Sequence, residues 1–571
     1  MNSIQRKHLV LYFFIFLFLI IIVTARLLYV MVADSKSYEE DIKDLHERER
    51  QIKGKRGEIL DRYGNVLASN KTVCTISVIH SQLNDENKVI KVLSKELQMD
   101  EDEIRKKVEK VSVREKIKSN VPKETGDKIR NYNLDGVKVD EDYKRNYPYN
   151  ELGSKILGFT GADNQGIVGL EVSYDKYLEG KSGNIYTVTD AFGKEIDGMA
   201  ELRQEGKRGD DLVTSLDLNI MKYARQSAIK ALAEKKANYV SIIVMNPTNG
   251  EIYAMVNEPE FNLNDPFTLN YECGIDKNSK EYQDLLNKMW RNNCINDTYE
   301  PGSTFKMVTG TAALEEKVVN TNSTFNCQGY KIVEDRRIKC HKTTGHGLEN
   351  FVTATMNSCN PVFIEVGLRL GVENMFKYMD RLGFMGKTGI DLPGEAGTII
   401  HKIENVGEVE LATMSFGQSF QITPLALLRA ACAIINGGNL VTPHFGVYTK
   451  DEEGNVTNKF EFPVISGVIS RDTSDTMKMI LEKVVSEGGG KFGQVEGYRV
   501  GGKTATSEKL PRNSGKYIGS FIGFAPADDP KIIAMCIIDE PQGVYYGGTI
   551  AAPVIADLYK NILPYLNIKK D

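Results

Sequence analysis

The sequence predicts a multidomain α+β protein with an N-terminal transmembrane helix. Its 571 residues exceed what one core usually organises and suggest about three or four structural units. An uncharged apolar run extends from Leu9 to Ala25, and its apolar character continues past Arg26 to Val32, which is long enough to span a bilayer. Beyond residue 211, strand-like and helix-like patterns alternate. These observations indicate an anchor followed by folded domains.

The composition argues against one class of function and one kind of scaffold. Hydrophobic residues make up 41% and charged residues 26%, as in a globular protein, and the net charge of -5 gives no basic signature for nucleic acid. The eight cysteines are spread along the chain rather than concentrated in a short secreted framework. Neither nucleic-acid binding nor a disulfide-stapled fold is therefore expected.

The apolar run is interpreted as a retained anchor rather than a cleaved signal peptide. A signal peptide has an apolar core of roughly 7–15 residues that ends in small residues, whereas the bulky Leu27, Leu28 and Tyr29 follow this run. Arg6 and Lys7 precede it and favour a cytoplasmic N-terminus. We expect a single-pass protein of the cytoplasmic membrane, with everything after residue 33 on the extracellular side.

Three further patterns organise the next part of the chain. Asp61 and Gly64 suit a hairpin turn that opens a folded region. A Lys/Glu-rich stretch from about 84 to 135 has helical spacing, with its charges on a solvated face. The alternating run 211–218 predicts a strand entering a new domain, so we place the main boundary near residue 215.

The remainder predicts helices that alternate with buried strands. Residues 219–236 have a helical pattern, and the apolar run 239–245 predicts a strand that pairs with the segment after it. Towards the C-terminus, residues 501–506 are followed by the apolar runs 517–524 and 531–539, which are typical of adjacent strands.

Ser303 and Lys306 form the first chemically informative pair. They lie in EPGSTFKMVTG, where Pro301 and Gly302 suit a turn and Ser303 could open a helix, so both side chains share one face. A desolvated lysine can be neutral enough to accept the proton of a neighbouring hydroxyl, and a helix N-terminus favours developing negative charge. Because this spacing also arises often by chance, the pair needs support from other motifs.

Two further motifs follow in order. Ser-Cys-Asn at 358–360 offers a hydroxyl and an amide that could relay a proton and hold a peptide, although alone it resembles any polar loop that ends a helix. The sequence GGKTAT at 501–506 suits a strand with Thr504 and Thr506 on one face.

These three motifs in this order resemble those of penicillin-binding proteins and serine β-lactamases. A second K-T-G, at 387–389, precedes IDLPGE and is set aside, because this context lies outside the catalytic strand in the family. The flanking segments resemble class B penicillin-binding proteins, and they are TGIDLPGE at 388–395, GQSFQITPLAL at 417–427, YGGTIAAPV at 546–554, RGEILDRYGNVLA at 56–68, and residues 147–170. The resemblance includes a membrane-proximal pedestal that β-lactamases lack.

The resemblance implies a fold, a function and partners. Residues 1–33 would be a cytoplasmic tail and anchor, 34–214 an elongated dimerisation or pedestal domain, and 215–571 a transpeptidase domain with an antiparallel sheet flanked by helices, as in serine β-lactamases. The protein would be a monofunctional peptidoglycan D,D-transpeptidase of septal, elongation or sporulation type that β-lactams inhibit. It would need no cofactor and would work with a polytopic membrane glycosyltransferase.

The resemblance also implies roles for the first two motifs. Ser303 would attack the penultimate D-Ala carbonyl of a stem pentapeptide, and Lys306 would accept its proton. Ser358 and Asn360 would assist the transfer and position the substrate. An amine of a second stem peptide would then resolve the acyl-enzyme.

The third motif would bind the substrate and the developing charge. Lys503 and Thr504 would hold the terminal carboxylate, and the backbone N–H groups of Ser303 and Thr506 would form the oxyanion hole. Ala505 departs from the family, in which glycine is usual, so we expect an altered substrate or β-lactam fit rather than lost activity.

Two other functions remain open at this point. A non-catalytic cell-wall peptide scaffold or β-lactam sensor would not turn over substrate. Ala505, which stands where the family usually has glycine, motivates this alternative. A D,D-carboxypeptidase or β-lactamase would instead transfer the acyl group to water. Acylation by a penicillin and product analysis with an acceptor amine distinguish these alternatives.

A group of thiols and imidazoles brackets the second motif. Cys327, Cys340, His341 and Cys359 are ligand types that zinc prefers, and His346 lies close by in the sequence. Their spacing matches no standard zinc motif, so buried, reduced or paired cysteines remain the alternative. The sequence thus offers a zinc site as a hypothesis.

Overall fold

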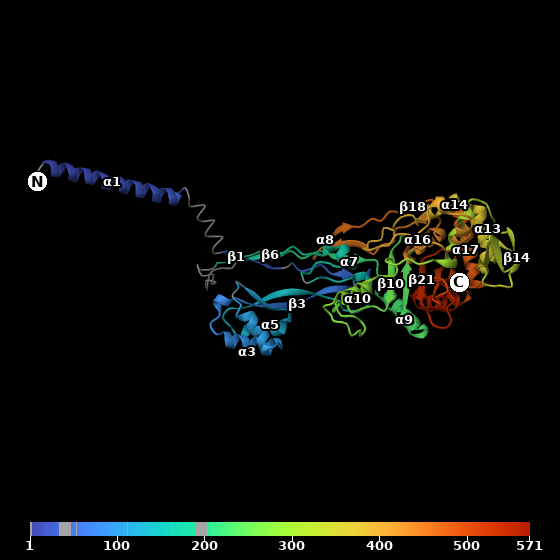
Figure 1. The fold of residues 1–571 in the computed structure, drawn as a ribbon, viewed down its shortest axis with the longest axis horizontal. Helices are drawn as coiled ribbons and strands as arrows, with labels where there is room; N and C mark the ends of the chain where they lie inside the picture. Colours follow the sequence, from blue (N-terminus) through green and yellow to red (C-terminus); the bar gives the residue numbers. More distant parts are fainter. Residues whose placement is uncertain are drawn as a thin grey trace. The chain divides into compact units, whose positions relative to one another are not determined.

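The computed structural model describes residues 3–32, 47–52, 54–110, 112, 114–161, 163–188, 202–204 and 206–570. The chain forms two compact units that are interleaved along the sequence (Figure 1). The first unit comprises Met1–Lys55, Lys71–Lys144 and Gly180–Arg208, and the second comprises Arg56–Asn70, Arg145–Glu179 and Gly209–Asp571. The main boundary near residue 215 is a position along the chain and stays a prediction.

The N-terminal apolar run forms helix α1, Ser3–Val32. The large apolar side chains between Leu11 and Tyr29 are exposed. Within the described residues this is the one helix long and apolar enough to cross a membrane. Because exposed apolar surface of this length is stable in a bilayer, the helix is consistent with a single-pass anchor.

The first unit contains a small α+β core beside a separate sheet. The separate sheet has the order β1-β6-β7, and the core combines strands and helices over Cys74, Ile90, Leu93 and their neighbours. Strand β3 (Val66–Val78) enters this unit at Lys71. The other elements are β1 (Glu47–Ile52), α3 (Glu86–Leu97), α4 (Glu101–Val108), β4 (Glu115–Pro122), α5 (Lys123–Asn131), β5 (Val137–Asn146), β6 (Gly183–Val188) and β7 (Leu202–Gln204).

The helical pattern predicted over 84–135 is correct for α3, α4 and α5 but wrong for β4. In β4 only Ile117 and Val121 are buried, and this strand pairs antiparallel with β3. Residues on the same side of a strand are an even number apart. The spacing of four therefore satisfies a strand as well as a helix, and pairing with β3 decides between them.

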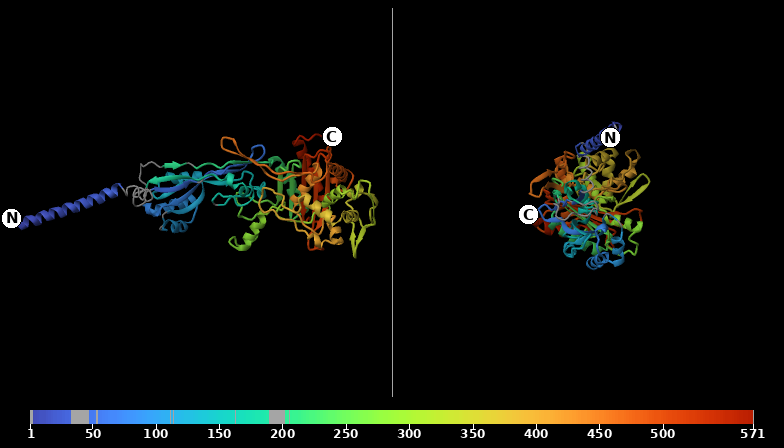
Figure 2. Two further views of the ribbon diagram at one scale, coloured as in Figure 1. Left: turned by 90° about the horizontal axis from the view of Figure 1, so that it is seen from above. Right: turned by 90° about the vertical axis from the view of Figure 1, so that its left-hand side faces the viewer.

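The second unit is built on a five-stranded antiparallel sheet. Its order is β10-β9-β21-β20-β19, with β19 at one edge. Figure 2 shows its late strands, in orange and red, beside the green strands of the middle of the chain. The strands are β9 (Tyr239–Met245), β10 (Ile252–Glu258), β19 (Gly501–Glu508), β20 (Tyr517–Ala525) and β21 (Ile532–Asp539). The predicted strands in these regions are confirmed, and the mostly apolar β9, β20 and β21 are buried almost along their whole length.

Two groups of helices flank this sheet, as the resemblance implied. In the first group the predicted helix packs on β10 and β9, and the C-terminal helix packs beside it on β20 and β21. In the second group one helix packs on β19, one packs on β21, and the third packs against these two helices. The first group is α9 (Leu218–Lys235) and α19 (Ala552–Tyr565), and the second is α11 (Lys306–Glu315), α16 (Pro424–Ile435) and α17 (Arg471–Ser486). The apolar side chains of all five contribute to one continuous core.

A second sheet of this unit joins early and late parts of the chain. Strand β2 (Ile59–Leu60) pairs parallel with β8 (Asp211–Thr214), which pairs with β16 (Gly446–Lys450), which in turn pairs with β17 (Val456–Lys459). The β2–β3 hairpin has the predicted turn, because the Asp61 carboxylate accepts hydrogen bonds from the backbone N–H groups of Tyr63 and Asn65 (both 2.8 Å) and Gly64 has a φ of +85°.

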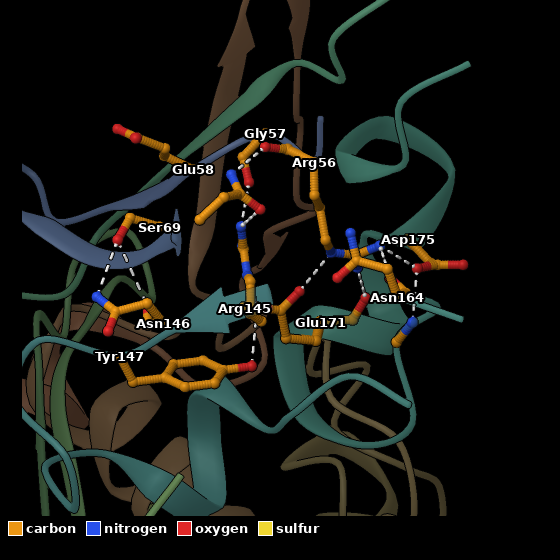
Figure 3. A network of polar contacts seen from close by, with 12 residues as sticks. Arg56, Gly57, Glu58, Ser69, Arg145, Asn146, Tyr147, Asn164, Glu171 and Asp175 are labelled. Atoms are coloured by element: carbon orange, nitrogen blue, oxygen red, sulfur yellow. Dashed lines mark hydrogen bonds and ion pairs between the residues drawn. The ribbon is translucent and has the colours of Figure 1, made fainter. Parts of the chain in front are cut away.

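A buried charge cluster holds this hairpin to two later segments. Arg56 Nε donates to Glu171 Oε2 at 2.7 Å, and Arg145 Nε donates to Oε1 of the same carboxylate at 2.6 Å (Figure 3). The hydroxyl of Tyr147 donates to the same carboxylate at 3.2 Å, and Arg56 Nη1 donates to Asp175 at 2.7 Å. A buried carboxylate is stable only when paired and hydrogen-bonded, so Glu171 fixes where these three segments meet.

Replacing Glu171 with glutamine should destabilise the second unit strongly. The change leaves two buried guanidinium groups without their shared negative charge, and breaking a buried pair costs about 3–5 kcal/mol. We expect the thermal unfolding midpoint of the second unit, measured in the full-length protein, to fall by about 3–6 °C. Glu179→Gln, at an exposed position eight residues away in the sequence, is the matched control and should change little. Equal midpoints for both variants would contradict the assignment.

Candidate active site

The turn that carries Ser303 is a short 3-10 helix, η2, Gly302–Phe305, which leads directly into α11 at Lys306. Gly302 has a φ of +57°, and a Cβ atom there would lie 2.4 Å from Ser507 Oγ, so only glycine lets β19 approach the turn this closely. Ser303 is half-buried, and its hydroxyl makes no hydrogen bond within the described residues. The side chain is therefore free to react.

Lys306 lies at the centre of the site and is fully buried. Its Nζ donates to Asn360 Oδ1 at 2.7 Å, to the Ser358 carbonyl at 2.7 Å and to Ser358 Oγ at 3.2 Å. Ser358 stands between α12 (Phe351–Met356) and α13 (Asn360–Leu370), with a left-handed φ of +51°. This conformation is uncommon for a residue with a side chain, and it turns the chain so that both Ser358 oxygens face Lys306.

Lys503 completes the cluster from the edge strand. It is also fully buried, and its Nζ donates to Ser358 Oγ at 2.9 Å and to the carbonyl of Thr504 at 3.1 Å. One hydroxyl therefore lies between two lysines. The structure thus brings together Lys306, Ser358, Asn360 and Lys503. The second Lys-Thr-Gly, at 387–389, lies instead in a loop in which the backbone N–H of Thr388 donates to Glu395.

Burial changes the charge state of both lysines. Desolvation lowers the pKa of Lys306 to about 7, against opposing effects of Cys359, Cys340 and Glu349. Desolvation, together with the neighbouring Lys306 ammonium, lowers the pKa of Lys503 well below its usual value. Because two like charges cannot both be maintained around one buried hydroxyl, a neutral amine is available at neutral pH.

The residues of the third motif alternate between the two faces of strand β19. Lys503 and Ala505 are buried, whereas Thr504 and Thr506 are half-buried, as the predicted alternation requires. The Ala505 side chain is 3% exposed, and its Cβ lies 3.6 Å from where a Cβ of Gly302 would be. The methyl group thus packs against the turn that carries Ser303. Thr506 Oγ1 accepts the backbone N–H of Gly547 at 3.0 Å.

The thiol cluster is compact, and its histidine differs from the predicted one. Ligand atoms of Cys327, Cys340, His346 and Cys359 all lie within 4.8 Å of one another. The predicted set contained His341, whose exposed ring lies 3.8 Å from Cys340 Sγ, a distance similar to the 3.7 Å from His346.

The register of a small hairpin explains why His346 joins the cluster. Strand β11 (Thr324–Cys327) pairs with β14 (Gly347–Asn350), with Cys327 opposite Gly347, so the residue before Gly347 lies beside Cys327. Sequence reasoning also missed Glu349, whose buried Oε1 has no hydrogen-bond partner and lies 4.0 Å from His346 Nδ1. In the sequence Glu349 is marked only by its place three residues after His346.

The fold and the three-motif cleft define a penicillin-binding transpeptidase, and comparison with known proteins agrees. The family model for the penicillin-binding protein transpeptidase domain matches residues 240–560, and the model for the penicillin-binding protein dimerisation domain matches residues 51–214. The chain therefore belongs to the penicillin-binding protein transpeptidase family, in its class B branch.

Relatives and solved structures give the same result. Stage V sporulation protein D of Bacillus subtilis is 38% identical over 580 residues, which cover 100% of this chain and 87% of that protein. Peptidoglycan D,D-transpeptidase FtsI of Escherichia coli K12 is 28% identical, with coverage of 95% and 89%. Penicillin Binding Protein 2X of Streptococcus thermophilus shares the fold, with a TM-score of 0.74 and 21% identity over 90% of this chain and 80% of that one.

Proposed function

We propose that Ser303 is the nucleophile through which this peptidoglycan D,D-transpeptidase cross-links stem peptides and reacts with β-lactams. The observation that carries the proposal is the buried Lys306, held by Ser358 and Asn360 three residues beyond an unbonded serine hydroxyl. A lysine with a lowered pKa next to a serine is the arrangement that activates a weak hydroxyl nucleophile. The position of Ser303 before the first turn of α11 adds favourable potential for the developing anion.

The acylation step follows from these contacts. Neutral Lys306 takes the proton of Ser303 as its Oγ attacks the carbonyl carbon of the penultimate D-Ala. The bond to the terminal D-Ala then breaks, and the leaving amine receives a proton through the Ser358 hydroxyl, which hydrogen-bonds to both lysines. Asn360 holds Lys306 in place and is available to bind the peptide.

The other motif residues bind the substrate and its charge. The backbone N–H groups of Ser303 and Thr506 stabilise the oxyanion, and each such donor typically contributes about 3–4 kcal/mol. Thr504, on the more accessible face of β19, and Lys503 bind the terminal carboxylate. In the second half-reaction an amine of another stem peptide attacks the ester, its proton returns to Ser303 Oγ, and an amide cross-link forms.

Mass spectrometry of the intact protein tests the nucleophile. Full-length protein in detergent should gain the mass of one penicillin, and Ser303→Ala should gain none. Ser358→Ala should still be acylated but about 100-fold more slowly or worse, because the proton relay is lost. An adduct on folded Ser303→Ala would assign the reaction to another residue. A folded wild-type protein without an adduct would favour the scaffold or sensor, and product release only to water would favour a carboxypeptidase or β-lactamase.

The acylation rate should rise about tenfold from pH 6 to pH 8. With a Lys306 pKa of about 7, the neutral fraction of the lysine increases from about one tenth to about nine tenths over this range. The protonated lysine cannot accept the Ser303 proton, so activity is lost as the pH falls. Stopped-flow measurement of penicillin acylation checks this, with the unfolding temperature recorded at each pH as a control. A flat profile would exclude Lys306 as the base.

We also propose the orientation and one partner. The Arg6 and Lys7 side of α1 lies in the cytoplasm, which places the catalytic unit outside the membrane, where peptidoglycan is assembled. A polytopic membrane glycosyltransferase supplies the glycan strands. The variant Lys560→Cys places a thiol at an exposed position of the catalytic unit. In intact cells a membrane-impermeant thiol reagent should label this variant in the proposed orientation and should not label it in the reverse one.

We propose, finally, that the thiol cluster binds one zinc ion as a structural site. Transpeptidases of this family need no cofactor for the reaction, so the metal would act on the fold. Three thiolates and one imidazole are a standard tetrahedral zinc set, with Zn–S of about 2.3 Å and Zn–N of about 2.0 Å. The 3.7 Å between Cys340 Sγ and His346 Nδ1 is close to the edge of such a tetrahedron. Cys359 lies between Ser358 and Asn360, so the ion would brace the second motif.

Zinc content distinguishes His346 from His341. We expect about one zinc per chain in native mass spectrometry, less than a tenth of this in His346→Ala, and full content in the control His341→Ala, because His346 shares the compact ligand group. Loss of zinc in His341→Ala alone would assign the ligand as the sequence predicted. Wild-type protein without zinc after metal incubation would leave the cluster as reduced, buried thiols.

A further inference from the structure

A cavity of about 770 Å³ lies in the second unit at the end of the five-stranded sheet. Its walls come from the start of β9, the end of β21, helix α10 (Lys280–Trp290) and the segment that leads to the Ser303 turn. None of the four clustered motif residues lines it, yet Tyr299 lies four residues before Ser303 and Lys509 lies three residues after Thr506. The cavity is therefore a separate space that shares two chain segments with the active site.

The acidic groups of this cavity already have partners. Asp539 accepts hydrogen bonds from Lys509 Nζ, at 2.9 and 3.0 Å, and from Asn238 at 2.9 Å. Asp297 is paired with Arg291 and accepts from Asn293 at 2.9 Å. These carboxylates are therefore neutralised by groups of the cavity wall itself, and they leave no negative charge to hold another cation.

Two lysines of the same wall have no such partner. Within the described residues, neither Lys155 Nζ nor Lys288 Nζ makes a hydrogen bond or an ion pair, and the Tyr239 hydroxyl also makes no hydrogen bond. The acids nearest Lys155 are Glu258 and Glu260, of which Glu258 accepts from Arg225 at 2.7 Å. Glu260 lies 3.8 Å from Arg225 Nε and accepts the backbone N–H of Gly153 at 3.0 Å, so this carboxyl also has its own partners.

We propose that this cavity binds the terminal carboxylate of a second peptidoglycan stem peptide, with Lys155 and Lys288 as its cationic partners. The inference rests on the proposed function, because that function brings free stem peptides to this unit. Uncommitted ammonium and hydroxyl donors match a carboxylate. The side-chain amide nitrogens of Asn270 and Asn293 donate within the protein, whereas their oxygens accept no hydrogen bond within the described residues and suit the N–H groups of a peptide backbone. The volume fits a peptide of a few residues rather than a single ion.

Calorimetry on penicillin-acylated, full-length protein in detergent tests the proposal, because the acyl group blocks Ser303 and leaves the cavity open. We expect a stem pentapeptide with a free C-terminal carboxylate to bind, and its C-terminal carboxamide to bind at least tenfold more weakly. Lys155→Met should weaken binding at least tenfold. Lys288→Met, at an exposed position that cannot disturb the core, should weaken it severalfold, whereas the exposed Lys560→Met should not.

The outcomes separate this proposal from the proposed function. Failure of the wild type to take up penicillin would overturn the nucleophile, whereas normal acylation without pentapeptide binding would overturn only the cavity site. Equal binding of carboxylate and carboxamide, or unchanged binding in both Lys155→Met and Lys288→Met, would also overturn it. Inorganic phosphate that displaces the pentapeptide at comparable concentration would show a general anion site instead of a peptide site.

Discussion

The active unit depends on burying two lysines around one serine hydroxyl. The three residues are far apart in the sequence, since Ser358 lies 52 residues from Lys306 and 145 from Lys503. A buried ammonium without acceptors costs several kcal/mol, so the surrounding chain must supply oxygens at fixed positions. The 3-10 turn, the left-handed Ser358 between two helices and the edge strand β19 each provide one side of this arrangement.

A second buried charge cluster performs the same task without chemistry. Glu171 joins Arg56 and Arg145, which are 115 and 26 residues away, and no reactive group or thiol lies among its hydrogen-bond partners. Arg56 and Tyr147 lie in two early segments that resemble class B proteins, 56–68 and 147–170, and Arg145 and Glu171 lie within two residues of the second one. These segments thus contribute paired buried charges, whereas the three motifs contribute the clustered lysines, hydroxyl and amide of the site.

The sequence predicted the elements better than it predicted their partners. The sheet of the second unit was predictable because β9, β20 and β21 are mostly apolar runs. The predicted helix also forms after the first motif, but it begins at Lys306, and Ser303 lies in the 3-10 turn before it. The strand β4 was not predictable, because two buried residues four apart fit either structure. The pairing of Arg56 with Glu171 and the place of His346 beside Cys327 depend on register and long-range contact, which local patterns do not encode.

The thiol cluster and the hydrogen bonds that hold Lys306 are joined through adjacent residues, and this limits how independently they can move. Cys359 is fully buried, its two neighbours both accept hydrogen bonds from Lys306, and its backbone N–H donates to the Ala354 carbonyl at 2.9 Å. Any change that moves Cys359 must therefore move Ser358 or Asn360, whose oxygens hold the Nζ of Lys306 in place. Because the Cys359 side chain belongs to the thiol cluster, a rigid cluster also restrains the two neighbouring residues that hold Lys306.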